Sequence, residues 1–489
     1  MTSVPNRPQQ LSGNKTIWLG ICCVMLLGSC DFFRKAQTGP KPKPDDDLGV
    51  IQGKKVYDPE TGTWKEVVTT PVGMPVDTVR WSDLPDRTFP PITSSTPGSP
   101  ESGTSSNTGP VVSPGGRYNV TMLMPFLSSQ NDASSSTIDS RSNLGIHYYA
   151  GAKMALDVLE QEGANFRVNV LDTEASANQT DKLIKENTDL AASHLILGAY
   201  RRDNVALLAA FAKDRKIPYV SPYNVLSGIS SDNPNYIQVN PSLQSHCQAI
   251  TRHIHQQFKP EQVVLVCLDS PEEIARLKFF QDENLRIQGN AAGKLFREFV
   301  VKDDSPDFHK FDLSPYLANA DETVFVVPSW AKEAFVYSFL RKAMITQQGQ
   351  SGNIVVYGMP QWLDYENIDY DYYEKLNVRI SASTFIDHNS QSIRDFKQAF
   401  FDRFAAAPRD DAYLGYDVTL FFGRMLMKYG PQFVNTIDQE HYQGLQTQFD
   451  FQKEVPPGAV GDDRLNRVDR YENKYLNILK FSNYHFQLD

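Results

Sequence analysis

Cysteine is scarce in this chain, and its positions exclude several kinds of protein. Of five cysteines in 489 residues, Cys22, Cys23 and Cys30 lie in or beside an N-terminal apolar run. Only Cys247 and Cys267 remain for the rest of the chain, each in an apolar stretch that suits a small buried thiol or a disulfide. No set of cysteines and histidines has the spacing of a zinc site, so we expect no metal and no other cofactor.

An excess of positive charge is also lacking. The chain has 58 acidic against 48 basic residues, a formal net charge of −10. Broad electrostatic capture of nucleic acid needs clustered lysine and arginine, so we expect no nucleic-acid partner. The 40% hydrophobic and 22% charged residues are ordinary for a globular protein and predict a large core.

Catalytic motifs are incomplete wherever they begin. Residues 289–294 are one residue short of a phosphate-binding loop and lack the following serine or threonine. Residues 228–232 lack the second glycine of a nucleophile elbow. His253 and His255 are two apart on a predicted helix, so they face different directions and cannot share a metal. We therefore predict that the protein is not an enzyme.

The chain has one long apolar run, residues 17–27, which follows Arg7 and Lys15. At about 11 residues it is short for a membrane span of roughly 20 and suits the core of a signal peptide. Residues 27–30 (Leu-Gly-Ser-Cys) resemble the lipobox of bacterial lipoproteins. That resemblance implies cleavage before Cys30 and attachment of acyl chains such as palmitate to its thiol, which makes membrane lipid a partner. The alternative is an anchor that ends in cysteine by chance.

Residues 31–117 are rich in proline, glycine, serine and threonine. Such a segment buries too little apolar surface to offset its ordering entropy, so it predicts a disordered tether. One island, residues 55–68, alternates around a Glu-Thr-Gly turn and predicts a small hairpin, which would be marginal in isolation.

From residue 118 to 489, short apolar strands alternate with amphipathic helices. We expect strands over residues 118–125, 167–171, 195–197, 218–220, 262–268, 323–327 and 353–357. We expect helices over residues 144–162, 179–190, 205–213, 245–258, 271–287 and 330–345. This alternation predicts an α/β protein with parallel sheets, and its fresh start near residue 243 predicts two lobes.

Five segments and a late helix resemble the successive landmarks of type I periplasmic-binding proteins of the leucine/isoleucine/valine-binding kind. They are residues 123–125, 149–157, 170–173, 196–198 and 217–222, followed by 412–417. The resemblance covers about 118–430 and implies two hinged lobes, each a mostly parallel sheet flanked by helices. It places lobe I at about 118–242 with a return segment at 385–440. Lobe II takes 243–384 with the C-terminal strands.

The loops that follow the predicted strands supply candidate cleft residues, since ligands of open α/β sheets bind beyond the carboxyl ends of strands. These candidates are Phe126, Ser128, Tyr200, Arg201, Ser221, Tyr223, Asn224, Ser329 and Trp330. In amino-acid-binding members the loop after the third strand is rich in serine and threonine, whereas here it contains Arg201. Arg201 would then clamp a carboxylate or phosphate, or else lie solvated at a helix start. Trp330 would face the ligand or pack beside the hinge.

The resemblance implies a membrane-anchored, non-catalytic lipoprotein that binds a small solute, such as an amino acid, between its lobes. The alternative is a protein scaffold or regulator of envelope assembly with an envelope protein as partner. The layout is similar to that of outer-membrane lipoproteins that activate peptidoglycan synthases, and the last segments resemble envelope lipoproteins of the Bacteroidetes. We therefore expect a location in the cell envelope, lipid-anchored at the outer membrane and facing the periplasm.

Overall fold

The computed structural model describes residues 55–58, 63–66, 116–131, 137–224, 228–289, 293–302, 312–317, 322–348, 352–456 and 467–489. The chain divides into the units Met1–Glu101 and Ser102–Asp489. Cys30, the predicted signal peptide and most of the predicted tether lie outside the described residues. In the first unit, β1 (Lys55–Asp58) and β2 (Thr63–Glu66) pair antiparallel, which confirms the predicted hairpin.

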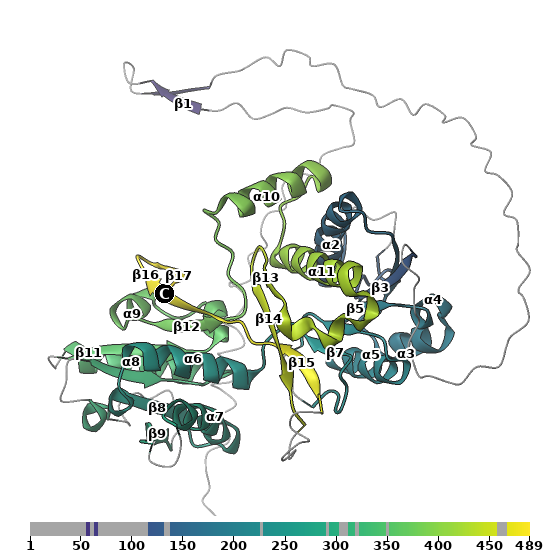
Figure 1. Ribbon diagram of the computed structural model, residues 1–489. Coiled ribbons are helices and arrows are strands. Elements are labelled where there is room, and N and C mark those ends of the chain that lie inside the picture. Colours follow the sequence, from purple (N-terminus) through teal and green to yellow (C-terminus); the bar gives the residue numbers. More distant parts are fainter. Residues whose placement is uncertain are drawn as a thin grey trace, which may run out of the picture. The chain divides into compact units, whose positions relative to one another are not determined.

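The second unit has two sheets, each flanked by helices (Figure 1). The first-lobe sheet has the order β13-β14-β15-β7-β6-β5-β3-β4, with parallel pairing from β15 to β4 and antiparallel pairing at β14. Its strands are β3 (Tyr118–Met124), β4 (Phe166–Asp172), β5 (Leu195–Gly198), β6 (Tyr219–Ser221), β7 (Tyr236–Gln238), β13 (His441–Gln443), β14 (Gln448–Glu454) and β15 (Arg470–Asn473).

The second-lobe sheet has the order β17-β16-β12-β11-β10-β8-β9, parallel from β9 to β12 and antiparallel at β16 and β17. Its strands are β8 (Val263–Leu268), β9 (Arg297–Val301), β10 (Glu322–Val326), β11 (Asn353–Gly358), β12 (Arg379–Ala382), β16 (Asn477–Ser482) and β17 (His485–Leu488). The predicted fold class, two lobes that each contain a mostly parallel sheet, is therefore confirmed.

Helices cover both sheets. The first lobe has α2 (Asn143–Gln161), α3 (Ala177–Glu186), α4 (Thr188–Ala191), α5 (Arg202–Arg215), α10 (Gln391–Phe404) and α11 (Asp410–Tyr429). The second lobe has α6 (Leu243–Gln257), α7 (Pro271–Ile287), α8 (Glu333–Gln348) and α9 (Tyr370–Lys375). Serine hydroxyls cap the first turns of α3, α6, α7 and α10 by accepting a backbone N–H, which fixes where these helices begin.

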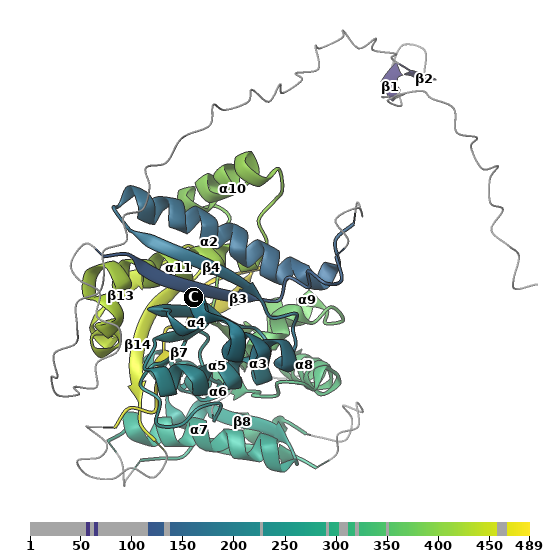
Figure 2. The ribbon, with the colours of Figure 1, turned by 90° about the vertical axis from the view of Figure 1, so that its right-hand side faces the viewer.

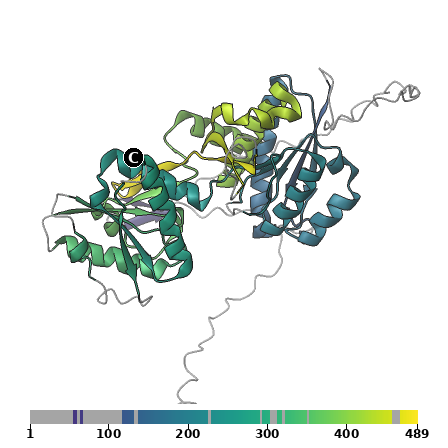
Figure 3. The ribbon, with the colours of Figure 1, turned by 60° about the horizontal axis from the view of Figure 1, so that its bottom comes forward.

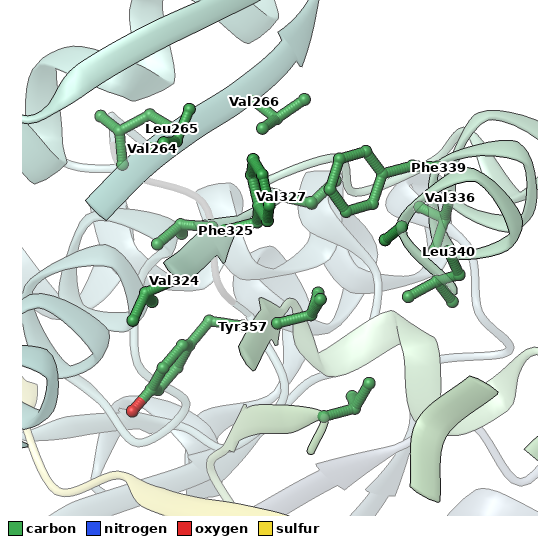
Figure 4. Packing of buried hydrophobic residues seen from close by; sticks show 14 of the residues in the cluster. Val264, Leu265, Val266, Val324, Phe325, Val327, Val336, Phe339, Leu340 and Tyr357 are labelled. Atoms are coloured by element: carbon green, nitrogen blue, oxygen red, sulfur yellow. The ribbon is translucent and has the colours of Figure 1, made fainter. Parts of the chain in front are cut away.

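The second-lobe core forms between its sheet and helices (Figure 4). All six residues of β8 are buried, because a parallel strand covered on both faces needs apolar side chains on both. Phe325 on β10 meets Phe339 on α8 edge to face, with ring centroids 5.5 Å apart. Cys247 and Cys267 lie in this core as free thiols, so of the two predicted states the buried thiol is the one observed.

In the first lobe, α2 and α11 lie side by side against the sheet (Figure 2). Two glycines permit this close approach. A Cβ atom on Gly151 would lie 1.8 Å from the Ala412 carbonyl oxygen, and one on Gly415 would lie 2.0 Å from the Tyr148 carbonyl oxygen. The start of α11 is thereby held close to α2.

Three segments connect the lobes: the links from β7 to α6, from β12 to α10, and from β15 to β16. Figure 3 shows the last of these as the yellow chain that leads to the C-terminus. Glu472 on β15 is fully buried beside the start of α6. Its carboxylate accepts the Ser242 N–H at 2.9 Å and the Ser245 hydroxyl at 2.5 Å, and pairs with Lys474 at 2.9 Å. Glu472 thus ties the last first-lobe strand to the first second-lobe helix.

The C-terminal strands, which we expected in lobe II, divide between the two sheets. Strands β13 to β15 join the first-lobe sheet, and only β16 and β17 extend the second. The reason lies in the inward side chains of β14, because Phe449 and Phe451 are fully buried and their rings pack against Phe421 of α11. These rings therefore complete the first-lobe core.

Candidate ligand-binding site

The carboxyl ends of β3, β4, β5 and β6 meet at one edge of the first sheet, because these strands are parallel. Ligands of open α/β sheets bind beyond this edge. A cavity of about 510 Å³ lies there, and we call it the arginine cavity because Arg141, Arg201 and Arg409 line it. Glu174 and Asp411 also line it. Its volume falls within the range of roughly 300 to 1,000 Å³ that is typical of small-molecule pockets.

Two further cavities continue from this one. The hinge cavity, about 190 Å³, is lined by Tyr223, Asn240 and Ser383 among others, and it shares Asp411 with the arginine cavity. A second-lobe cavity of about 420 Å³ shares Ser383 and Asp410 with the hinge cavity. The three cavities therefore adjoin along the first-lobe edge and the links between the lobes.

Three of the nine predicted cleft residues line these cavities. Strand β5 ends at Gly198, and Tyr200 and Arg201 follow in the turn that leads into α5, where both line the arginine cavity. Tyr223 follows β6 and lines the hinge cavity. The rings of Tyr200 and Tyr223 meet edge to face with centroids 5.5 Å apart, so the two loops are in direct contact.

Phe126 and Ser128 belong to a loop whose polar groups are satisfied within the lobe. The Asp172 carboxylate accepts the backbone N–H of Phe126 at 2.9 Å and that of Ser128 at 2.7 Å. Burial opposes ionisation of Asp172, but these donors outweigh it and lower the pKa of the carboxyl. The Ser128 hydroxyl donates to Glu174 at 3.0 Å, and the Phe126 ring packs edge to face on Tyr149. Neither residue lines any of the three cavities.

The other four predicted residues do not line the three cavities either. Ser221, within β6, and Asn224 are both buried in the first lobe. Ser329 is fully buried in the second lobe and donates its hydroxyl to Glu273 at 2.8 Å. Trp330 packs on the second-lobe core, with its ring edge to face with His246 at 6.2 Å. Trp330 therefore occupies the packing position that we gave as its alternative.

The sequence reasoning missed Arg409 and Asp411, which stand at the start of α11 and line the arginine cavity. The sequence predicts the late helix but does not indicate that its N-terminus lies beside the carboxyl ends of β3 and β5. The sequence Arg-Asp-Asp directly before an apolar helix was the available signal, because three consecutive charges at a helix start seldom belong to a core.

Asp411 and Tyr223 join the arginine and hinge cavities. The Tyr223 hydroxyl donates to the Asp411 carboxylate at 2.9 Å. Burial raises the pKa of Asp411, although the hydrogen bond from Tyr223 opposes the shift. Burial also raises the pKa of Tyr223 well above its usual value, so this hydroxyl remains a proton donor. The pair offers a carboxyl group at the inner wall of the arginine cavity.

Arg201 and Arg409 are both exposed, and their guanidinium groups make no hydrogen bond or ion pair with any residue that the structure describes. Arg141, in contrast, pairs with Asp139 at 2.5 Å. The cavity therefore presents two guanidinium groups without a protein partner among the described residues, and such groups bind carboxylates and phosphates.

The described part of the chain contains no helix long and apolar enough to cross a membrane. Within those same ranges, no group of three or more histidine, cysteine, aspartate or glutamate side chains is arranged to hold a metal ion. His253 and His255 contact different partners, since one bonds to the Tyr357 hydroxyl and the other to Asn284.

Two α/β lobes, joined by three links beside a row of cavities, define a two-lobed binding protein. The chain belongs to the periplasmic binding protein family, because a model of that family matches residues 140–458. Comparison with curated proteins gave no match.

Solved structures share this fold at low identity. One is a Rhodospirillum rubrum protein proposed to be a branched-chain amino acid ABC transporter. Its sequence is 14% identical, the match covers 76% of this chain and 99% of that chain, and the TM-score is 0.54. Another is a branched-chain amino acid ABC transporter periplasmic ligand-binding protein of Burkholderia xenovorans, with 12% identity over 76% of this chain and 94% of that chain, and a TM-score of 0.52. At such identities the likeness concerns the fold alone.

Proposed function

We propose that this chain is a non-catalytic lipoprotein of the bacterial envelope that binds a small solute, such as an amino acid or a similar molecule, in the arginine cavity. The observation that carries the proposal is the position of this cavity of about 510 Å³ at the carboxyl edge of the first sheet. The start of α11 forms part of the cavity wall, and the link from β12 of the second lobe leads through α10 to α11. Movement of the lobes would therefore change access to the solute.

A metabolite screen by thermal unfolding of the full-length protein tests solute binding. A ligand that binds only the folded state raises the apparent stability, by about 2.7 kcal/mol at a hundredfold excess over Kd. We expect at least one metabolite to raise the melting temperature, and Tyr200→Ala to reduce that rise. Tyr200 is 48% exposed, so its removal spares the fold, and Tyr484→Ala at a 61% exposed second-lobe site is the matched control. Absence of any shift across the screen would refute solute binding.

The anchor is a separate part of the proposal and rests on residues 1–30. Signal cleavage before Cys30 and acylation of its thiol would place the protein at the outer membrane, facing the periplasm, with residues 31–117 as the tether. Wild-type protein should fractionate with membranes, and Cys30→Ser should move it out of that fraction. The intact mass of the wild-type protein should include the acyl groups. A mature chain without them, starting elsewhere, would contradict the anchor.

A scaffold or regulator of envelope assembly is the second candidate. It is favoured by the six predicted cleft residues that line none of the three cavities, including Ser128 and Ser221. If the screen gives no shift and crosslinking in cells captures one envelope protein reproducibly, the scaffold role replaces solute binding.

A further inference from the structure

The arginine cavity contains two cationic groups, Arg201 and Arg409, that form no ion pair with a residue that the structure describes. Arg201 precedes α5 and Arg409 precedes α11, so distant parts of the chain bring both to one cavity. Several other arginines of the first lobe pair with carboxylates, although Arg202 and Arg215 form no ion pair with a described residue either. The pairs include Arg141 with Asp139, Arg167 with Asp189, Arg403 with Asp157 and Arg424 with Glu162. For Arg201 and Arg409 the described residues provide no such partner.

The two carboxylates in the cavity wall already have other donors. Glu174 accepts the Ser128 hydroxyl at 3.0 Å, and the Ser129 N–H and hydroxyl at 2.8 and 2.9 Å. Asp411 accepts the Tyr223 hydroxyl at 2.9 Å; burial raises the pKa of this carboxyl, whereas the hydrogen bond from Tyr223 and the charge of Arg409 lower it. Neither carboxylate forms an ion pair with Arg201 or Arg409 within the described chain, so the guanidinium groups stay available to a ligand.

The N-terminal ends of α5 and α11 also favour binding of an anion in the arginine cavity. Neither α5 nor α11 has a side chain that accepts a hydrogen bond at its N-cap, whereas α3, α6, α7 and α10 have serine caps. Both helices therefore begin at the cavity without a side-chain cap, which favours an anion there, while acidic residues in their first turns, Asp203 on α5 and Asp410 and Asp411 on α11, offset part of the helix dipoles.

We infer that the solute of the arginine cavity carries at least two negative charges, as in a dicarboxylate or a phosphorylated small molecule. This inference rests on the proposed function and adds the chemical class of the solute. Arginine stays charged at every physiological pH, and its fork binds carboxylate or phosphate oxygens in pairs. A dianion engages both guanidinium groups, whereas a solute with one carboxylate engages one. Tyr200, beside them, offers its ring to the organic part of the solute.

Titration calorimetry of the full-length protein with glutarate, glycerol 3-phosphate and leucine tests the inference. We expect at least one of the two dianions to bind, and leucine to bind more weakly or not at all. Removal of one charge-assisted hydrogen-bonding group should weaken dianion binding roughly 10- to 100-fold in Arg201→Gln and in Arg409→Gln. Arg201→Lys keeps the charge and should recover part of the affinity.

Arg202→Gln is the matched control, since Arg202 is the exposed neighbour on α5 and does not line the cavity. Unchanged dianion affinity in this variant supports a specific role for Arg201, and melting temperatures establish that each variant is folded. Failure of both dianions to bind, or binding that neither arginine substitution weakens, overturns the inference. Leucine binding that is indifferent to both substitutions would also overturn it while leaving the proposed function intact. The metabolite screen, in contrast, decides the proposed function by itself.

Discussion

Acid should loosen the link between the lobes through Glu472. This side chain is fully buried on β15, and besides Ser242, Ser245 and Lys474 its carboxylate contacts the Arg470 guanidinium at 2.9 Å. Burial by itself would raise the pKa of Glu472. The charge of Lys474, the hydrogen bonds from Ser245 and Ser242, and Arg470 outweigh burial and lower the pKa from 4.5 to about 2.

The sign and size of the effect follow from this pKa. A carboxyl whose pKa is lower in the folded state binds its proton more readily in the unfolded chain. Glu472 therefore stabilises the fold above about pH 4.5, and this contribution is lost as the pH falls towards about 2. The difference corresponds to about 3 kcal/mol. At neutral pH, Glu472→Gln should cost a similar amount, because Lys474 and Arg470 then lose their shared buried partner.

Urea unfolding at several pH values, followed by circular dichroism, measures this contribution. We expect Glu472→Gln to be about 3 kcal/mol less stable than wild type at neutral pH, with the gap closing as the pH approaches 2. Glu186→Gln, at an exposed position near the end of α3, is the control and should change stability by less than about 0.5 kcal/mol. A gap for Glu472→Gln that stays constant from neutral to acid pH would refute the reasoning, because the loss would then come from shape and not from charge.

Three other outcomes can be tested directly. Gly415→Ala should destabilise the first lobe by roughly 1 to 3 kcal/mol in urea unfolding, because the added Cβ would lie 2.0 Å from the Tyr148 carbonyl oxygen. An unchanged free energy of unfolding would contradict the close approach of α2 and α11. Asp172→Asn should speed hydrogen exchange at the Phe126 and Ser128 amides, since a charged acceptor is lost; unchanged protection would exclude this role. Burial raises the pKa of the Cys267 thiol to about 12, so iodoacetamide should label this thiol only after denaturation. If the native protein were labelled as fast as the unfolded chain, the burial of Cys267 would be contradicted.

The fold was largely predictable because its signal is local. Each predicted strand of the two parallel sheets is a short apolar run, and covering on both faces makes such runs continuous. The observed strands β7, β9 and β12 were not predicted, since β7 has only three residues and β9 has partly exposed side chains. The sheet that each C-terminal strand joins was also beyond local reasoning. It depends on where Phe449 and Phe451 are buried, which only the packing of α11 decides.

The candidate site was predictable only where it follows the strands directly. Tyr200, Arg201 and Tyr223 line cavities because they come just after β5 and β6, and this position could be inferred from the order of strands. Ser128 has the same type of position, yet its hydroxyl is bonded to Glu174, a pairing of side chains that strand order does not reveal.

The part of the site that escaped prediction depends on contacts between helices. Gly151 and Gly415 let α2 and α11 approach until backbone atoms of each helix would clash with a Cβ on the other. This contact fixes the first turn of α11, and with it Arg409 and Asp411, at the carboxyl edge of strands β3 to β6, which end between Met124 and Ser221, far before α11 in the sequence. A residue that widens the helix contact should therefore shift Arg409 away from Arg201. The charge pattern of the cavity is then a consequence of helix packing, and binding of a dianion should be more sensitive to Gly415→Ala than the overall fold is.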